Sequence, residues 1–265
     1  MRFGNASLST GIRVHYAEQG DSSGAPIVFL HGWPDSWFTF SRVLPALPRT
    51  LRAIAVDQRG FGDSDHPASG YTFQELAADA VALLDALGIE RAAIVGHSFG
   101  SFVARELAIA HPQRVTGLVL IGTGFSTSTP VMQSLRAAVR TLPNPIPEPF
   151  AREFQASTAY RALAPEFFDR IVVESLKIPA PLWPVMIDQL LQYDATAALG
   201  NLRVPILMLW GDQDALFSRA EQDLFLAAVA DARLKVYEET GHCPNWERPD
   251  DVAADIASFM RLRGT

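Results

Sequence analysis

The stretch AAIVGHSFG, residues 92–100, joins a short apolar segment typical of a buried strand to the start of an amphipathic segment typical of a helix. Residues 96–100 (GHSFG) have the Gly-x-Ser-x-Gly pattern of a nucleophile elbow in its required strand–turn–helix context. Both glycines suit a turn too tight for side chains, and the helix expected at 98–110 directs its N-terminal N–H groups toward the serine. A glycine-rich connection without chemistry is the alternative. We predict that Ser98 is a nucleophile at the edge of a sheet.

The same strand–helix rhythm extends along most of the chain. In residues 71–87, apolar side chains recur at helical spacing, with Thr72 as a candidate N-cap and Gly88 as a helix-terminating glycine. Continuous apolar strands that alternate with helices predict an α/β fold with a parallel sheet covered on both faces. The expected strands are 12–18, 27–30, 51–56, 92–95, 115–121, 206–210 and 234–237, and the expected helices of this part are 71–87, 98–110, 219–230 and 250–262.

Residues 125–200 interrupt this rhythm and hold nine of the chain's 18 prolines. Because proline ends or redirects helices, we expect short helices bent around one another, with helical stretches at 131–141 and 183–193. The segment is interpreted as an inserted helical cap, with a separate fold as the alternative. The remaining residues, 1–124 and 201–265, then form the two parts of one core.

A serine nucleophile needs a base and an acid that orients the base, and after such an elbow the acid precedes the histidine in the chain. Two histidines follow the elbow. His111 ends a helix, which indicates a C-cap, whereas His242 lies in a loop directly after the last expected strand, so we predict His242 as the base. Asp214 and Asp212 compete as the acid. We choose Asp214, which lies further into its loop and can turn back toward His242, and keep Asp212, more typical of a turn residue, as the fallback.

Acyl chemistry also needs two backbone N–H donors for the oxyanion, one after the nucleophile and one from a loop after an earlier strand. The Phe99 N–H is the first. The second is expected in residues 31–34 (HGWP), where the Trp33 N–H stands between a glycine that permits close approach and a proline that cannot donate. We expect His31 to brace this loop rather than to react.

Composition excludes several function classes. The chain of 265 residues has a formal net charge of −7, which argues against the basic face that nucleic-acid binding needs. Its one cysteine, Cys243, excludes a disulfide framework and a Cys-rich metal site, and we expect a buried spacer thiol there. Neither a membrane-spanning apolar run nor a signal-peptide pattern in residues 1–10 is present, nor a P-loop or dinucleotide motif. We expect a cytoplasmic protein with no metal, cofactor, nucleic-acid or membrane partner, and make no prediction of its oligomeric state.

Together these segments resemble the α/β-hydrolase superfamily over nearly the whole chain. The resemblance implies a mostly parallel eight-stranded sheet flanked by helices, a structural turn at residues 57–64, and a helical cap at 125–200 that shapes the substrate pocket. The segments that carry it are 31–34 (HGWP), 57–64 (DQRGFGDS), the elbow around Ser98, 211–214 (GDQD) and 241–242 (GH).

Residues 31–37 (HGWPDSW) also resemble the corresponding loop of epoxide hydrolases and of haloalkane or fluoroacetate dehalogenases. Those relatives use an aspartate at the nucleophile position, whereas this chain has Ser98. Tyr160 and Tyr193 superficially resemble an epoxide-polarising pair, but core tyrosines are the more ordinary interpretation. The serine therefore favours acyl transfer to water over epoxide or halide chemistry.

We predict a serine hydrolase of the carboxylesterase or lactonase type, which cleaves a small or medium ester or lactone through an acyl-enzyme intermediate. The alternatives are a C–C bond hydrolase of ring-cleavage diketones, a cofactor-free perhydrolase and a non-catalytic ligand receptor on the same scaffold. The cap arginines Arg136, Arg140 and Arg152 could bind a substrate carboxylate but are more often solvated. The apolar cap residues, some of which line the pocket while others form the cap core, are Met132, Phe150, Phe154, Phe167, Phe168, Trp183 and Met186.

Overall fold

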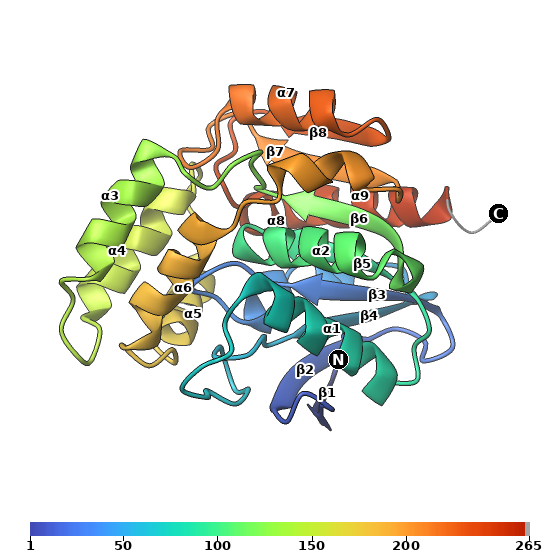
Figure 1. Cartoon of the computed structure of the whole chain (residues 1–265), viewed down its shortest axis with the longest axis horizontal. Coiled ribbons are helices and arrows are strands. Elements are labelled where there is room, and N and C mark those ends of the chain that lie inside the picture. Colours follow the sequence, from blue (N-terminus) through green and yellow to red (C-terminus); the bar gives the residue numbers. More distant parts are fainter. Residues whose placement is uncertain (263–265) are drawn as a thin grey trace.

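The structure, a computed structural model, describes residues 1–262. Eight strands form one sheet in the order β1-β2-β4-β3-β5-β6-β7-β8 (Figure 1). The pairs β1–β2 and β2–β4 are antiparallel, and the other five neighbouring pairs are parallel. The predicted α/β fold with a mostly parallel sheet is therefore confirmed. The strands are β1 (Arg2–Ser7), β2 (Arg13–Gln19), β3 (Ala25–Leu30), β4 (Leu51–Val56), β5 (Ala92–His97), β6 (Val115–Ile121), β7 (Ile206–Gly211) and β8 (Ala232–Tyr237).

Strand β1 has no counterpart among the strands expected from the residue pattern. It pairs with β2, with Arg2 opposite Glu18 and Ser7 opposite Arg13. It lies at the edge of the sheet, and Ala6 is its one buried residue. A strand that buries so little lacks the apolar alternation by which strands are recognised. The eighth strand was therefore implied only by the family resemblance.

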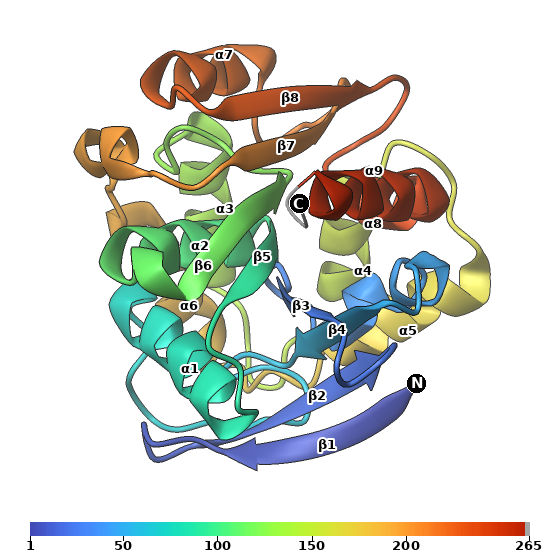
Figure 2. The same cartoon turned by 90° about the vertical axis from the view of Figure 1, so that its right-hand side faces the viewer.

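The sheet separates two cores because side chains alternate between its faces. In β3, Val28 and Leu30 pack under α1, α2 and α7, whereas Ile27 and Phe29 pack on the face that α9 covers. Figure 2 shows α1 and α2 on one side of the sheet and α8 and α9 on the other. These helices are α1 (Phe73–Ala86), α2 (Phe99–Ala110), α7 (Arg219–Ala228), α8 (Pro244–Glu247) and α9 (Pro249–Arg261).

The helices of the core begin and end close to the residues expected from their capping signals. The Thr72 side chain accepts from Glu75 N–H and the Glu75 side chain accepts from Thr72 N–H, which is a capping box at the start of α1. Past the end of α1, Gly88 has a φ of 66°, as a terminating glycine should. Within residues 1–262, none of the helices combines the length and the apolar character needed to cross a membrane.

Four helices stand between β6 and β7 and form a layer beside the sheet, on the left of Figure 1. Three of them have proline as their first or second residue: Pro130, Pro149 and Pro165 stand where the missing N–H has no helical partner to lose. Only the first and last of the four correspond to the helical stretches expected at 131–141 and 183–193, because a proline taken as a helix end hides a helix that starts beside it. We call them the inserted helices: α3 (Pro130–Val139), α4 (Glu148–Thr158), α5 (Pro165–Ser175) and α6 (Leu182–Gln192).

The first turn of α2 lies directly against the end of β3. A Cβ atom on Gly100 would overlap the carbonyl oxygens of Leu30 and His31, and one on Gly96 would overlap the carbonyl oxygen of Gly100. These obstacles are backbone atoms, which cannot move aside without shifting β3 or α2. The two glycines of the elbow are therefore required by packing as well as by the turn.

We expect Gly100→Ala to lower the free energy of unfolding by about 3 kcal/mol, because the added methyl overpacks a rigid contact. Gly200 is a matched control, since nothing lies within 4 Å of a Cβ placed there. Gly200→Ala should change the free energy of unfolding by less than about 0.5 kcal/mol. Equilibrium urea unfolding followed by circular dichroism measures both values, and equal stability of the two variants would contradict the packing argument.

Candidate active site

Ser98 stands at the turn between β5 and α2 in a strained backbone conformation. Its φ of 49° and ψ of −118° are rare for residues other than glycine. Ser98 N–H donates to Ile121 O at 2.9 Å, and Ser101 N–H donates to Ser98 O at 2.8 Å. Strain of this kind costs on the order of 1–3 kcal/mol and persists only where the surroundings impose it. The strand–turn–helix context predicted around Ser98 is present.

The loops after β7 and β8 bring Asp214 and His242 together. Asp214 Oδ2 lies 2.9 Å from His242 Nδ1. The other carboxylate oxygen, Oδ1, accepts from the backbone N–H groups of Leu216 at 2.8 Å and Phe217 at 3.0 Å, and both side chains of the pair are buried. With the Nδ1 proton directed at the carboxylate, a neutral imidazole keeps its basic lone pair on Nε2.

Asp212, the fallback acid, faces a different partner. Its carboxylate accepts from Thr240 N–H at 3.3 Å and so links the two loops. The structure therefore places Asp214, and not Asp212, beside His242. His111 is the C-cap residue of α2, as predicted.

The loop that carries His242 is anchored to the segment around α4. His242 N–H donates to the carbonyl oxygen of Thr158, the last residue of α4, at 2.8 Å. The Glu247 carboxylate accepts from Gly241 N–H at 2.9 Å and from Arg161 N–H at 2.7 Å. Main-chain groups of the inserted segment thus hold this loop in place.

Two backbone segments lie next to Ser98. Phe99 is the first residue of α2, where N–H groups have no partner within the helix. In the loop after β3, a Cβ atom on Gly32 would lie 3.1 Å from Ser98 Cβ, and Trp33 is the next residue. His31 braces this loop as predicted, because its Nδ1 lies 2.8 Å from Gly32 O and its Nε2 accepts a backbone N–H from the loop after β4 at 3.1 Å.

Ser98 and His242 line one cavity. His242 Nε2 is buried and has no hydrogen-bond partner in the part of the chain that the structure describes. A serine hydroxyl and an unpaired imidazole nitrogen thus face the same space. The apolar wall of the cavity is formed by Met132, Leu135, Phe154, Leu190, Leu216 and Phe217.

Of the apolar residues proposed for the pocket wall, Met132 and Phe154 line this cavity. The others pack within hydrophobic clusters: Phe150, Phe168, Trp183 and Met186 with the main core, and Phe167 with Trp246. Leu135 and Leu190 line the cavity but were not singled out from the sequence. The rotation of each inserted helix decides which of its apolar residues face the site.

The tyrosines and arginines of the insertion have partners away from the cavity or face solvent. Tyr160 is 56% exposed, and Tyr193 O–H donates to Glu106 Oε2 at 3.1 Å. None of these residues lines the cavity. The arginine ion pairs are Arg136 and Arg140 with Asp188, and Arg152 with Glu148 and Asp169.

One side of the cavity is polar, and its acidic residue was not among the predicted site residues. Asp35 is 2% exposed, and burial raises the pKa of its carboxyl group to about 7. Burial, together with the neighbouring His242, holds the pKa of the His97 imidazole well below its ordinary value. Burial also raises the pKa of the Cys243 thiol, which agrees with the expected buried thiol. The polar side is lined by Asp35, His97, Gln155, Thr158 and Cys243.

Comparison with known proteins places this arrangement in a family. A family model described as alpha/beta hydrolase fold matches residues 25–249. The chain belongs to the α/β-hydrolase family. A 2-hydroxymuconate semialdehyde hydrolase from Pseudomonas sp. (strain CF600) is 29% identical over 97% of this chain and 93% of that one. A non-heme chloroperoxidase from Streptomyces lividans is 30% identical over 97% of this chain and 99% of that one.

Solved structures share the fold. The crystal structure of an enol-lactonase from Burkholderia xenovorans LB400 superposes with a TM-score of 0.84 at 22% identity and covers 97% of this chain and 100% of that chain. At this identity the likeness shows a common α/β-hydrolase fold.

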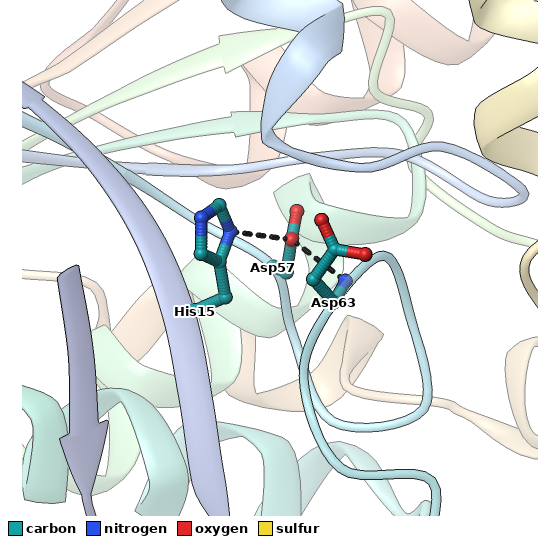
Figure 3. A group of neighbouring side chains, drawn as sticks. All are labelled: His15, Asp57 and Asp63. Carbon is teal, nitrogen blue, oxygen red and sulfur yellow. Dashed lines mark hydrogen bonds and ion pairs between the residues drawn. The ribbon is translucent and has the colours of Figure 1, made fainter. Parts of the chain in front are cut away.

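In this α/β-hydrolase, residues 57–64 form a turn organised by one buried carboxylate. Asp57 Oδ1 accepts from Trp37 N–H at 2.7 Å. Asp57 Oδ2 accepts from Asp63 N–H at 3.0 Å and lies 2.9 Å from His15 Nδ1 (Figure 3). The hydrogen bond to Asp57 raises the pKa of His15. These contacts agree with the structural role that the family resemblance implied.

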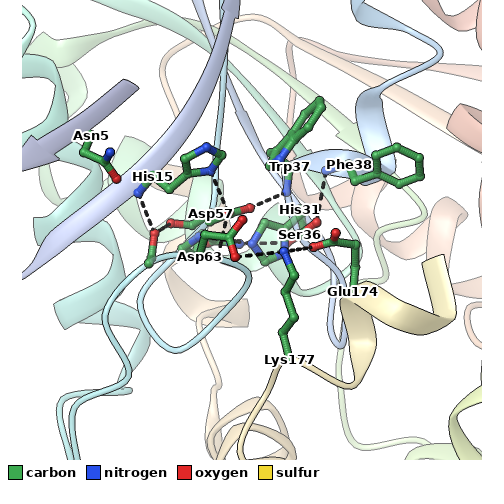
Figure 4. A network of polar contacts seen from close by, with 12 residues as sticks. Asn5, His15, His31, Ser36, Trp37, Phe38, Asp57, Asp63, Glu174 and Lys177 are labelled. Atoms are coloured by element: carbon green, nitrogen blue, oxygen red, sulfur yellow. Dashed lines mark hydrogen bonds and ion pairs between the residues drawn. The ribbon is translucent and has the colours of Figure 1, made fainter. Parts of the chain in front are cut away.

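His15, Asp57 and Asp63 also place metal-ligand atoms within 4.8 Å of one another. An ammonium group already pairs with one of these carboxylates, because Lys177 Nζ donates to Asp63 Oδ1 at 2.8 Å and lies 3.0 Å from Glu174 Oε2 (Figure 4). The hydrogen bond from Lys177 lowers the pKa of Asp63. The polar cluster therefore connects the turn to the segment after α5.

We expect Asp35→Asn to be more stable than the unmodified protein at pH 8, with an advantage that shrinks toward pH 5. Burial raises the pKa of Asp35 from 3.8 to about 7. The protonated carboxyl group therefore contributes fully to the stability of the folded protein below pH 3.8, and this contribution is lost as the pH rises through about 7. The asparagine carries no charge and avoids this loss. Melting curves at both pH values measure the effect, at about 2–4 °C for each kcal/mol.

Asp169→Asn is the matched control, since Asp169 is 60% exposed on α5. Its melting temperature should follow that of the unmodified protein at both pH values. A difference between Asp35→Asn and the unmodified protein that does not change with pH would contradict the burial argument.

Proposed function

We propose that this chain is a serine hydrolase that cleaves a small or medium carboxylic ester or lactone through an acyl-enzyme intermediate. Ser98 is the nucleophile, His242 the general base and Asp214 the acid that orients the base. The observation that carries the proposal is the unpaired His242 Nε2, which shares a cavity with Ser98 while Nδ1 faces Asp214 at 2.9 Å. In such an arrangement the base can take the serine proton and its charged form is stabilised.

In the first step, Ser98 Oγ attacks the carbonyl carbon and His242 Nε2 takes the hydroxyl proton. The Asp214 carboxylate stabilises the imidazolium. The backbone N–H groups of Phe99 and Trp33 stabilise the negative charge on the former carbonyl oxygen. His242 then gives its proton to the departing alkoxide oxygen, and the acyl group stays on Ser98.

In the second step, water takes the place of the alcohol. His242 removes a proton from the water as its oxygen attacks the acyl carbon, and the same two N–H groups stabilise the second oxyanion. When this intermediate collapses, Ser98 Oγ leaves and regains a proton from His242. The products are a carboxylic acid and an alcohol, which in the case of a lactone are one hydroxy acid.

We propose that residues 125–200 act as a cap that shapes the substrate pocket. Support comes from Met132, Leu135, Phe154 and Leu190, which project from this segment into the cavity that contains Ser98. Pockets of this kind recognise mostly apolar molecules through a few well-placed polar groups. In this arrangement the scissile carbonyl lies at Ser98 and apolar substituents of the substrate lie against the inserted helices.

A second candidate is hydrolysis of a C–C bond. It is favoured by the 29% identity, over 97% of this chain, to the 2-hydroxymuconate semialdehyde hydrolase. The same nucleophile and base would serve, but the leaving group is then carbon and must be protonated on carbon. The similarity to a non-heme chloroperoxidase makes hydrogen peroxide a further acyl acceptor to include in a substrate panel.

Turnover of p-nitrophenyl esters should fall by about 10⁴-fold in Ser98→Ala, because the acyl-enzyme cannot form. Ser22→Ala is the control, since Ser22 lies in an exposed turn, and it should leave the rate unchanged. The release of p-nitrophenol over a series of acyl lengths is the measurement. Absence of both turnover and burst in the unmodified protein would overturn the esterase proposal, and selective turnover of dienol diketones would favour the C–C candidate.

Asp214→Asn and Asp212→Asn form a matched pair in one loop. The first should lower kcat by about 10⁴-fold, because an asparagine beside Nδ1 no longer stabilises the imidazolium and can favour the wrong tautomer. The second should leave kcat nearly unchanged, because Asp212 contacts Thr240 N–H and not His242. Steady-state kinetics with one ester measures both, and a larger loss in Asp212→Asn would reassign the acid.

A further inference from the structure

Asp35 is a buried carboxyl group on the cavity wall, and His97 is the one basic side chain within 4.0 Å of it among residues 1–262. Gln155 Nε2 donates to Asp35 Oδ1 at 2.9 Å, and Thr39 supplies a second side-chain hydrogen bond. A carboxylate offers about four lone-pair directions. About half of its accepting capacity is therefore available to a molecule in the cavity.

His97 presents an unused nitrogen next to this carboxyl group. His97 Nδ1 lies 3.8 Å from Asp35 Oδ2, beyond hydrogen-bond distance, and has no hydrogen-bond partner in the described residues. Its Nε2 lies 3.4 Å from His242 O, an acceptor, so Nε2 carries the ring proton. Burial keeps the imidazole neutral by holding its pKa low. Nδ1 is therefore a free acceptor on a side chain that is only 2% exposed.

Two polar atoms at this separation can share one ligand oxygen placed about 2.8 Å from each. A hydroxyl suits both groups while Asp35 is protonated, because it can donate to His97 Nδ1 and accept from the carboxyl proton. When Asp35 is ionised, the hydroxyl proton can serve only one of the two acceptors. A carbonyl or carboxylate oxygen has no proton for Nδ1, and a methyl group leaves both atoms unpaired. We propose that Asp35 and His97, with Gln155 holding the carboxyl group, form a hydroxyl-binding subsite, so that the substrate of Ser98 is a hydroxylated ester or lactone.

The subsite lies beside the reacting centre. A Cβ atom on Gly32 would lie 3.0 Å from His97 Nδ1 and 3.1 Å from Ser98 Cβ, so both atoms lie close to the same backbone position. A hydroxyl bound there belongs on one of the carbons nearest the scissile bond, on either its acyl or its alcohol side. The inference rests on the proposed ester chemistry and adds to it the class of substrate.

A purely structural bridge is the competing explanation. Gln155 Nε2 also donates to Ser175 Oγ at 2.8 Å, so Asp35 links the loop after β3 to α4 and α5. Such a bridge needs only one acceptor for Gln155, which an asparagine at this position provides without burying a carboxyl group at a cost in free energy. The bridge also leaves His97 Nδ1 unexplained, whereas a ligand hydroxyl accounts for both groups.

The test compares near-isosteric esters in Asp35→Leu, which removes the donor and the acceptors at this position, and in the surface control Asp169→Leu. On the acyl side, ethyl 3-hydroxybutanoate is compared with ethyl 3-methylbutanoate and ethyl 3-aminobutanoate. On the alcohol side, 2-hydroxyethyl butanoate is compared with propyl butanoate. Acid release at constant pH gives kcat/KM for each ester. The readout is the ratio of hydroxylated to methyl ester, which general structural damage would leave unchanged because it affects both esters alike.

We expect the unmodified protein and Asp169→Leu to prefer one hydroxylated ester by about 10- to 100-fold, the value of a hydrogen bond to a charged or buried partner. Asp35→Leu should lower that ratio by about tenfold or more. A ratio near one for both pairs, or an undiminished ratio in Asp35→Leu, overturns the subsite. Preference for the amino ester over the hydroxy ester also overturns it, in favour of a cation site.

Binding of the same esters to Ser98→Ala, measured by calorimetry, separates the two proposals because it needs no turnover. A hydroxyl preference in binding together with no hydrolysis by the unmodified protein supports the subsite and overturns the esterase chemistry. Hydrolysis with equal binding of the paired esters supports the chemistry and overturns the subsite. Failure of every ester to bind overturns the subsite as well.

Discussion

The geometry of the site depends on the close approach of two backbones where β5 turns into α2. Glycines at positions 96 and 100 let the first turn of α2 rest on the carbonyl oxygens of Leu30 and His31. This contact sets Ser98, in its positive-φ conformation, beside the loop that follows β3. Because parallel strands end at the same edge of a sheet, the loops after β7 and β8 deliver the Asp214–His242 pair to the same place. One steric constraint thus aligns groups from four separate loops.

Patterns of adjacent residues in the sequence were sufficient to predict the structure wherever contacts between those residues determine it. The strand–turn–helix around Ser98 and the capping box at Thr72 are examples, since each needs only a few adjacent side chains. These patterns were insufficient where partners distant in the sequence determine the structure. β1 is a polar edge strand that is held by its pairing with β2. The helices α4 and α5 start at or next to a proline, which from the sequence alone looks like a helix end.

The site shows the same division. The contact between Asp214 and His242 could be predicted, because each lies in the loop directly after a strand and the two strands, β7 and β8, are neighbours. The residues of the cavity wall could not be predicted, because the packing of α3 against α6 determines which apolar side chains turn toward the cavity. Asp35 was not singled out because an acidic residue after a proline is ordinarily a solvated turn residue. Its burial depends on Gln155, which lies 120 positions away in the chain.

The hydrogen bond from His242 N–H to Thr158 O has a consequence for the modularity of this architecture. An inserted segment of this kind looks like a separate unit that could be exchanged between related proteins to change substrate specificity. Here, however, the insertion also supplies the anchor for the histidine loop, and Arg161 adds a second tie through Glu247. In a chimera that carries the inserted segment of another protein, the contacts that hold the loop around His242 would therefore be different. The cavity wall and the Asp214–His242 pair have to be exchanged, or redesigned, as one unit.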